Sequence, residues 1–252
     1  MKGYLYETHL HTSEASACGE VNGADYISFM KSKGYSGMIV TDHFFNGNSA
    51  VKRDLPWSER VAIYVSGFKA AEFAAKDKDF DVLFGIEFNF EGDEYLIYGV
   101  DEKWLLDNDD ILSLTRREVY LRVHEAGGIM IQAHPYRERY YLSDIRLTPD
   151  VSDGIEVYNA ANSDNQNALA LRYAQELNVP ITSGSDIHYF HGRPMGGMML
   201  PRRIKSSAEY AKLVMSGEAI PVKVTSEQVI SILDMPELEA PADAPTVPVL
   251  RF

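Results

Sequence analysis

The stretch YLYETHLHT, residues 4–12, predicts a short strand that ends in two histidines. An aromatic and aliphatic run opens the strand, which we expect to span Tyr4 to His9. His9 and His11 flank Leu10, so the two-residue period of a strand directs both imidazoles from one face toward one point. Two convergent imidazoles can bind a metal ion. Taken alone, however, an HxH pair in a strand is more often incidental than a pair of ligands.

Histidine, aspartate or glutamate residues also stand at the ends of four further expected strands. The segment MIVTDH ends in Asp42 and His43, VLFGIEF carries Glu87, GIMIQAHP carries His134, and SGSDIH carries Asp186 and His188. Five of the seven histidines thus fall at strand ends. Barrel active sites are built at the C-terminal ends of strands, and chance placement across five strands is much less plausible than at one. The pattern predicts a metal site.

Short β-branched and aromatic runs alternate with longer helical patterns, which indicates repeated βα units and a largely parallel sheet. The expected strands are Tyr4 to His9, Gly37 to Thr41, Val82 to Phe88, Tyr95 to Val100, Gly128 to Ala133, Gly154 to Tyr158 and Pro180 to Ser183. The expected helices are Ala24 to Lys33, Ser58 to Lys78, Asp110 to Glu125, Asp164 to Leu177 and Ser207 to Met215. Gly34 and Gly127 stand where a helix-ending residue is wanted, and Ser58 precedes a helix with an acid just inside it.

The length of 252 residues allows two small domains, but an α/β barrel fills the same length as a single domain. We expect a barrel domain over residues 1–235. The stretch 236–252, PELEAPADAPTVPVLRF, is rich in Pro and Ala and predicts an extended or partly disordered tail. Its apolar end, residues 247–252, could dock on the body or on a neighbouring subunit.

Charge and cysteine content limit the partners and the compartment. The formal net charge is -13 and no window is rich in Lys and Arg, which disfavours long nucleic acid as a partner. Cys18 is the one cysteine, so no internal disulfide can form and a reducing compartment is expected. The first residues lack the apolar stretch of a signal peptide, and no later segment has the apolar length of a membrane span. We expect a cytoplasmic protein without a membrane partner; its oligomeric state stays open.

The motifs HLHTSEASACG, TDH, GIE, AHP and SGSDIH, in this order, resemble the motif series of the PHP (polymerase and histidinol phosphatase) family. The resemblance covers the chain from about His9 to about Gly197. It implies a distorted TIM-like (β/α)7 barrel of seven strands, a centre of two or three divalent metal ions (Mn, Fe or Zn), and phosphoesterase activity. The family pattern makes His9, His11, Glu87 and Asp186 ligands of one metal, with Glu87 bridging. It makes His43 and His188 ligands of a second, while His134 shares a third with Glu87.

Two departures from the family pattern leave parts of the ligand set open. Family members usually carry a further Asp or His soon after the HxH pair, where this chain offers Glu14 and Cys18. We expect Glu14 to be the ligand, because a hard carboxylate suits Mn-like ions while a thiolate would favour Zn. Relatives also often carry a His where this chain has Glu94, which either substitutes for it or leaves a weak third site.

Other polar residues near the strand ends are candidates for supporting roles. Arg137 and Arg139, just after AHP, could bind a phosphate group, as could Arg193; we select Arg137 and Arg193. Asp42 could fix the tautomer of a ligand imidazole, or could cap the following turn instead. Glu156, with Asn159, should line the same mouth behind the ligands. His124 fits a structural role, and His191 is at most a substrate contact.

These residues predict a phosphoesterase that hydrolyses a small phosphorylated metabolite or nucleotide, using a hydroxide that bridges the metal ions. An amidohydrolase-type barrel also begins with HxH, but such barrels usually bridge their metals with a lysine, and no expected strand here ends in one. A third possibility is a metal-binding interaction module that has lost catalysis.

Overall fold

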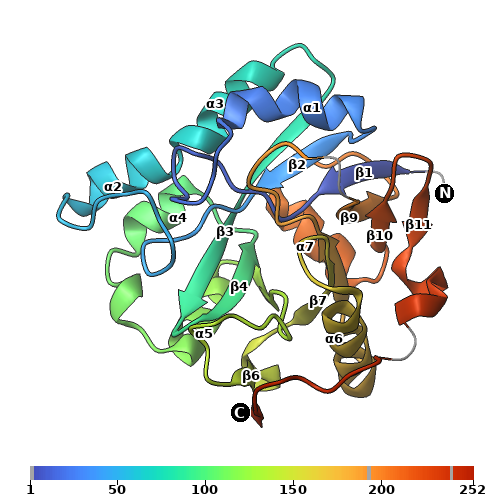
Figure 1. Cartoon of the computed structure of the whole chain (residues 1–252). Helices are drawn as coiled ribbons and strands as arrows, with labels where there is room; N and C mark the ends of the chain where they lie inside the picture. The colour runs from blue at the N-terminus through green and yellow to red at the C-terminus, as the bar shows by residue number, and fades with distance from the viewer. Residues whose placement is uncertain (1–2, 192–193, 239–240) are drawn as a thin grey trace.

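The computed structural model describes residues 3–191, 194–238 and 241–252, and it has a mixed α/β fold built on a curled sheet (Figure 1). In the described part of the chain this sheet has ten strands in the order β11-β10-β9-β1-β2-β3-β4-β5-β7-β8. Their bounds are β1 Tyr4–Glu7, β2 Gly37–Val40, β3 Asp81–Phe90, β4 Asp93–Tyr98, β5 Ile129–Gln132, β7 Gly154–Asn159, β8 Ile181–Gly184, β9 Met195–Leu200, β10 Ile220–Val224 and β11 Val229–Ser231. All seven expected strands are present, and the α/β class is confirmed.

The sheet differs from the expected ring of seven βα units, because only parts of it are parallel. β1, β2 and β3 pair in parallel, as do β5, β7 and β8, but β4 is antiparallel to both of its neighbours. The turn between β3 and β4 has only two residues, Glu91 and Gly92, both with positive φ, and so short a turn can join only antiparallel strands. The unexpected strands β9 to β11 are also antiparallel. β9, MGGMML, lacks the β-branched residues that mark a strand.

The two arms of the curled sheet meet where β8 lies against β9. No backbone ladder joins them; instead Gly196 and Gly197 donate their amide hydrogens to the hydroxyls of Ser185 (2.9 Å) and Ser183 (3.1 Å). Gly196 permits this approach, because a Cβ there would overlap the carbonyl group of Gly184. Just beyond β8, Ile187 pairs in parallel with the chain that follows β1. The ends of β1 and β8 are thereby held side by side.

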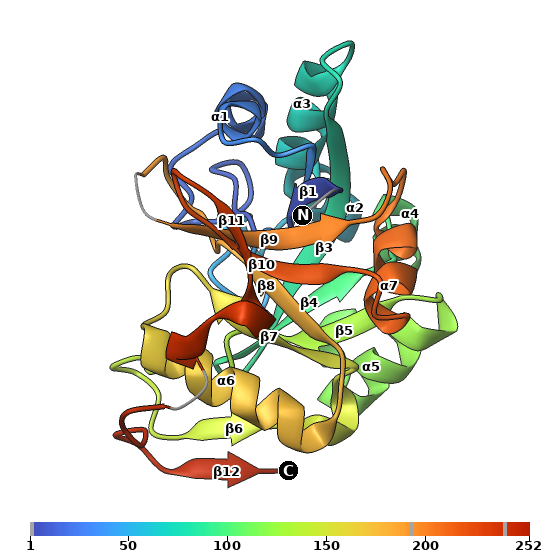
Figure 2. The ribbon, with the colours of Figure 1, turned by 90° about the vertical axis from the view of Figure 1, so that its right-hand side faces the viewer.

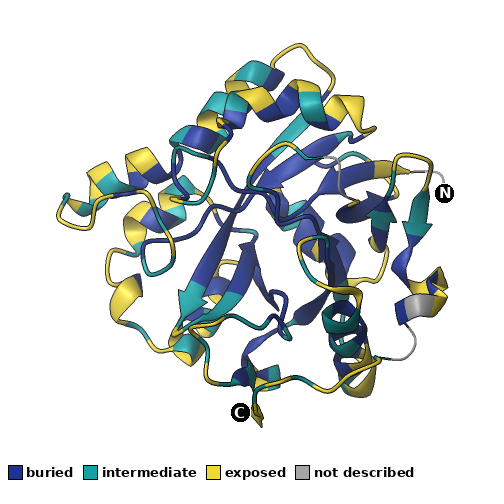
Figure 3. Cartoon of the chain, viewed as in Figure 1, coloured by how far each residue is buried: buried dark blue, intermediate teal, exposed yellow. Residues whose placement is uncertain are grey.

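Helices cover the outer side of the sheet and present their exposed faces to solvent (Figure 3). Their bounds are α1 Tyr26–Ser32, α2 Trp57–Tyr64, α3 Ser66–Ala75, α4 Glu102–Asp107, α5 Arg116–Glu125, α6 Asp164–Leu177 and α7 Ser207–Met215. Capping boxes at Thr115 and Ser163 bind the free backbone amides of the first turns of α5 and α6 and so fix where these helices begin. The helix expected from Ser58 is divided at Val65 into α2 and α3, and Ser58 is not its cap, since α2 starts at Trp57 directly after Pro56. Gly34 and Gly127 follow α1 and α5 with φ of 84° and 77°, as expected.

The end of the C-terminal tail is docked on the body. Strand β12, Val249–Arg251, pairs in parallel with β6, Ile145–Leu147, and forms a separate two-stranded sheet (Figure 2). Val247 packs against the apolar cluster beneath α6. In the described ranges of the chain, no helix combines the length and the apolar character needed to cross a lipid bilayer.

The close approach of β8 and β9 yields a stability prediction. Gly196→Ala places a methyl group against the backbone of Gly184, so we expect the free energy of unfolding to fall by about 1–3 kcal/mol. Urea unfolding followed by circular dichroism measures the change. Gly47→Ala is the matched control, because the nearest atom to its added methyl is at 3.4 Å, an ordinary contact distance. Equal stability of the two variants would contradict the packing described for this seam.

Candidate metal centre

The polar residues expected at the strand ends meet in one place. His9 and His11 follow β1, His43 follows β2, Glu87 lies on β3, His134 follows β5, and Asp186 and His188 follow β8. The carboxyl ends of neighbouring parallel strands open toward the same edge, which is why side chains so distant in sequence converge. His43 pairs directly with Glu87 in a parallel bridge. All of these residues except His188 are buried.

His9, His11 and Asp186 have the spacing of ligands around one ion, and Glu87 lies beside this group with one oxygen near each imidazole. The Nε2 atom of His9 is 3.0 Å from Glu87 Oε1 and 3.5 Å from Asp186 Oδ1. The Nε2 atom of His11 is 3.2 Å from Asp186 Oδ1 and 3.5 Å from Glu87 Oε2. Four donors at about 2.1 Å from a tetrahedral ion lie roughly 3.4 Å from one another. The geometry therefore fits a divalent cation at the centre of this group.

Glu87 and Glu94 extend the cluster toward solvent. Nδ1 of His43 lies 2.6 Å from Glu87 Oε2 and 3.6 Å from Glu94 Oε1. Nε2 of His134 lies 3.2 Å from Glu87 Oε1 and 3.5 Å from Glu94 Oε2. Each carboxylate thus faces both imidazoles, one oxygen to each, as a bridging carboxylate does. Glu94 occupies the place in doubt from the sequence and lies within the cluster.

A relay of hydrogen bonds fixes the tautomer of His11. Ser16 donates its hydroxyl hydrogen to Asp42 (2.7 Å), so its oxygen can only accept from Nδ1 of His11 (3.1 Å). His11 therefore carries its proton on Nδ1 and turns the lone pair of Nε2 toward Asp186. Asp42 was expected to act on an imidazole; it does so through Ser16, and it also accepts from the backbone and hydroxyl of Thr12. Burial raises the pKa of Asp42 to about 7, while bonds from Ser16 and Thr12 counteract it.

Glu156 orients His9 from behind. Its Oε1 is 2.9 Å from Nδ1 of His9, while Oε2 accepts from the backbone of His134 (3.1 Å) and from the amide of Asn159 (2.9 Å). A carboxylate on one ring nitrogen and a metal on the other is the usual environment of a histidine ligand. The structure thus places Glu156 where the sequence suggested, behind the candidate ligands.

The buried charges of the cluster call for a cation. Burial alone would lower the pKa of His9 and of His43, but the carboxylates facing them raise both pKa values well above the ordinary range. Burial followed by the neighbouring imidazoles of His188 and His43 lowers the pKa of His11, which stays neutral. Nε2 of His9 and His11, Nδ1 of His43 and Oε2 of Glu87 are buried without a hydrogen-bond partner in the described structure. Protons can neutralise this charge in part, and divalent ions fit the donors.

Two of the candidate ligands have a strained backbone. His134 has a φ of 29° and Asp186 a φ of 53°. Both values lie in the left-handed region, which L residues rarely adopt. Each such residue costs on the order of 1 kcal/mol or more, and strain of this kind concentrates at functional sites. Here it turns each side chain away from the direction of its strand and into the cluster.

Glu14 was expected to be a ligand, and the structure places it elsewhere. Its two carboxylate oxygens accept from the backbone amide of Gly23, both at 3.2 Å, on the side of the loop that faces α3. Cys18 faces the cluster instead, with its thiol beside His43 and His188. Burial raises the pKa of Cys18, but bonds to His188 and His43 outweigh it and lower the pKa to about 6.

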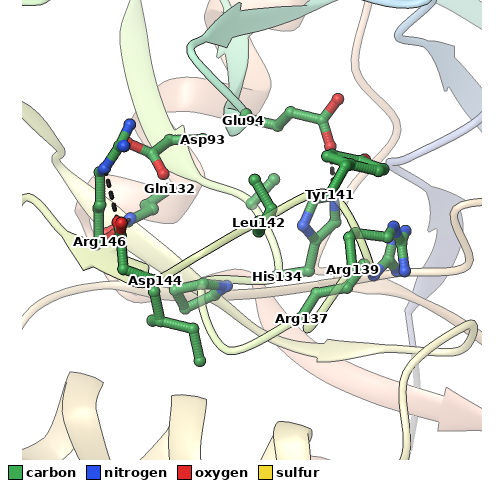
Figure 4. A pocket seen from close by; sticks show the side chains of 14 residues that line it. Asp93, Glu94, Gln132, His134, Arg137, Arg139, Tyr141, Leu142, Asp144 and Arg146 are labelled. Carbon is green, nitrogen blue, oxygen red and sulfur yellow. Dashed lines mark hydrogen bonds and ion pairs between the residues drawn. The ribbon is translucent and has the colours of Figure 1, made fainter. Parts of the chain in front are cut away.

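The two arginines after His134 differ in their contacts: the guanidinium of Arg137 is fully hydrogen-bonded, and that of Arg139 is not. Arg137 is buried and uses all three guanidinium nitrogens: it pairs with Asp186 and donates to Asn159 (2.5 Å) and Asn162 (2.6 Å). Arg139 is only half-buried and lines the mouth of the cluster; across the described residues, no hydrogen bond or ion pair engages its guanidinium. Figure 4 shows the adjoining pocket, which Arg139 also lines together with Glu94, His134 and Tyr141. Arg193 lies outside the described residues.

The other histidines lie where the sequence suggested. His124 is on α5 and pairs with Asp153 (2.9 Å), away from the cluster. His191 lines a hollow next to the cluster, together with Cys18, Asp186 and His188.

Glu7 is a buried residue that the sequence reasoning missed. Its carboxylate accepts from the backbone of Thr8, His9 and Ser185 and from the Ser185 hydroxyl, so it joins the ends of β1 and β8. Glu7 has the same strand parity as His9 and His11, and that spacing was the signal available.

Solved structures share this fold at low sequence identity. A two-domain protein from Bacteroides vulgatus ATCC 8482, described as containing a predicted PHP-like metal-dependent phosphoesterase, is 15% identical, with a TM-score of 0.68 over 91% of this chain and 67% of that one. An amidohydrolase from Chromobacterium violaceum, with bound sulfate and no metal, is 14% identical, with a TM-score of 0.50 over 73% of this chain and 87% of that one. No protein-family model and no curated protein sequence matches the chain. These similarities establish a common fold.

The position of Glu156 yields a prediction about metal affinity. In Glu156→Gln one oxygen becomes an amide NH2, which faces the donors of Asn159 and His134 and no longer supplies charge to His9. We expect the affinity for Mn²⁺ or Zn²⁺ to fall about 10–100-fold, measured by isothermal titration of the folded variant.

Glu176→Gln, an equivalent change on the exposed face of α6, is the control and should leave the affinity unchanged. Wild-type affinity in Glu156→Gln would show that this carboxylate does not support a metal ligand.

Proposed function

We propose that the protein is a metal-dependent phosphoesterase of the PHP type that hydrolyses a small phosphorylated substrate. One observation carries the proposal: imidazoles and carboxylates from five separate strand ends converge at ligand spacing, and four of their buried atoms, on His9, His11, His43 and Glu87, have no hydrogen-bond partner among the described residues. The motif series and the fold shared with a PHP-like protein point to the same class.

The proposed ligand set follows from the distances. His9, His11, Glu87 and Asp186 would hold one ion. Glu87 and Glu94 each face His43 and His134 and could hold a second ion with them, and His188 lies with His11 and His43 in a further group of three imidazoles. This set has room for two or three ions of Mn, Fe or Zn, borderline metals that accept both imidazole and carboxylate.

The metal ions, when bound, supply an activated water and neutralise the charge that develops on the phosphoryl oxygens. The protein contributes the geometry. Ser16 and Glu156 hold the imidazoles of His11 and His9 in the tautomer that presents Nε2. Arg137, which also donates to Asn159 and Asn162, holds the carboxylate of Asp186. Burial of these donors keeps bulk water from competing for them. The donor atoms are thereby oriented before an ion binds.

Arg139 is the best-placed group for binding the phosphate of the substrate. Arg137 was the choice from the sequence, but its nitrogens are engaged with Asp186 and two asparagines. Arg139 lines the pocket over the cluster beside Glu94 and Tyr141, and its guanidinium is free to bind a ligand. A guanidinium can donate two parallel hydrogen bonds to the oxygens of a phosphate.

The enzyme class can be tested with a substrate panel. We expect purified protein with added Mn²⁺ to hydrolyse phosphomonoesters faster than phosphodiesters, and amides not at all. Faster hydrolysis of amides would favour the amidohydrolase alternative. Bound metal without any turnover would favour a binding module that has lost catalysis.

His11→Ala links the panel to the proposed centre. The change removes a buried ligand, so both the bound metal, measured by elemental analysis, and the turnover should be lost. His124→Ala, on the surface of α5, is the matched control and should retain both. Retained activity in His11→Ala would show that the proposed centre is not the catalytic site.

Arg139 yields a separate prediction on substrate binding. We expect Arg139→Ala to raise KM for the best phosphomonoester roughly ten- to hundredfold, the value of a charge-assisted hydrogen bond, with metal content unchanged. Steady-state kinetics measures the effect. Arg117→Ala, which removes an exposed arginine of α5, should leave KM as it is. An unchanged KM in Arg139→Ala would assign the phosphate to another group.

A further inference from the structure

We propose that the thiolate of Cys18 is a ligand of the ion held by His43 and His188, which makes this position selective for a soft divalent ion such as Zn²⁺ or Fe²⁺. This inference rests on the proposed metal centre and refines it.

The backbone on both sides of Cys18 is anchored to the loops that carry the two histidines. Ala17 donates its amide hydrogen to Asn48, in the loop that follows His43 (2.8 Å), and Glu20 donates to the carbonyl group of His188 itself (2.8 Å). Ser16, two residues earlier, accepts from the amide of His43 (3.0 Å). The loop therefore holds Cys18 between the residues that follow β2 and those that follow β8.

The side chain of Cys18 faces the cluster. The thiol contacts the imidazoles of both His43 and His188, and it lines the same opening as Glu87, Glu94 and Asp186. It is only half-buried, so an incoming ion can reach it. Glu14, the carboxylate expected to serve here, is held by Gly23. Cys18 therefore presents its sulfur to the cluster from this loop.

The neighbouring imidazoles point to a ligand independently of the cysteine. His11, His43 and His188 each offer a nitrogen, and the three atoms lie within 4.8 Å of one another. Nδ1 of His43 is buried without a hydrogen-bond partner. A thiolate beside such nitrogens gives the mixed sulfur and nitrogen donor set that zinc and ferrous iron prefer over manganese. Binding breaks the S–H bond and releases the proton to solvent, with no change of oxidation state.

Cobalt substitution tests the inference directly. Co²⁺ bound by a thiolate gives a charge-transfer band in the near ultraviolet, and the chain has one cysteine, so any such band belongs to Cys18. We expect the full-length chain loaded with Co²⁺ to show this band, and Cys18→Ser to lose it while retaining visible cobalt bands from the other sites. Ser13→Ala, a change on the outer side of the same loop, is the control and should keep the band.

The outcomes separate this inference from the proposed function. Bound cobalt with no charge-transfer band in the wild-type protein overturns the role of Cys18 and leaves the metal centre standing. A chain that binds no cobalt overturns both. If Cys18→Ser does not fold, alkylation of the wild-type thiol by iodoacetamide decides: Zn²⁺ should suppress the reaction, and an equal rate with and without Zn²⁺ would refute the inference.

Discussion

The structure depends on one electrostatic requirement: carboxylates and imidazole lone pairs gathered in a buried space need positive charge among them. Glu87 and Asp186 are almost inaccessible to water, and the Nε2 atoms of His9 and His11 face them without a hydrogen-bond partner. Buried anions lose their hydration, so they need positive charge nearby, and Arg137 beside Asp186 supplies only part of it. The surrounding hydrogen bonds of Ser16, Asp42 and Glu156 are arranged to keep those lone pairs directed inward. A folded chain with these contacts is already organised to receive positive charge beyond that of Arg137.

The fold meets this requirement by bringing strand ends together and then bending the chain. His9, His11 and Glu87 come from the regular alternation of strands, whereas His134 and Asp186 reach the cluster only through a left-handed backbone. Glu7, at the end of β1, accepts a hydrogen bond from Ser185, directly after β8, and Arg137 pairs with Asp186, the next residue. The stability lost in the strained residues is offset by the packing of the sheet and helices around them.

Much of the centre could be predicted from sequence, because strand ends and alternation are local properties. His9, His11, His43, Glu87, His134, Asp186 and His188 all lie at strand ends in the sequence, and all meet in the structure. What could not be predicted depends on contacts between distant segments. Whether Glu14 or Cys18 faces the cluster is set by hydrogen bonds of their loop to Asn48 and His188. The antiparallel β4 follows from a two-residue turn at Glu91 and Gly92, which lacks the Asn-Gly signal of such turns, and β9 has a composition unlike that of a strand.

The contact between β8 and β9 determines how the strand end next to the metal centre is held. A continuous backbone ladder resists sliding, whereas the hydroxyls of Ser183 and Ser185 can rotate and keep their partners through small displacements. Asp186 and His188 stand directly after this seam, where Arg137 and the pairing of Ile187 with Leu10 hold the chain in place of a ladder to β9. On this side the centre is therefore positioned by side-chain contacts as much as by regular strand pairing.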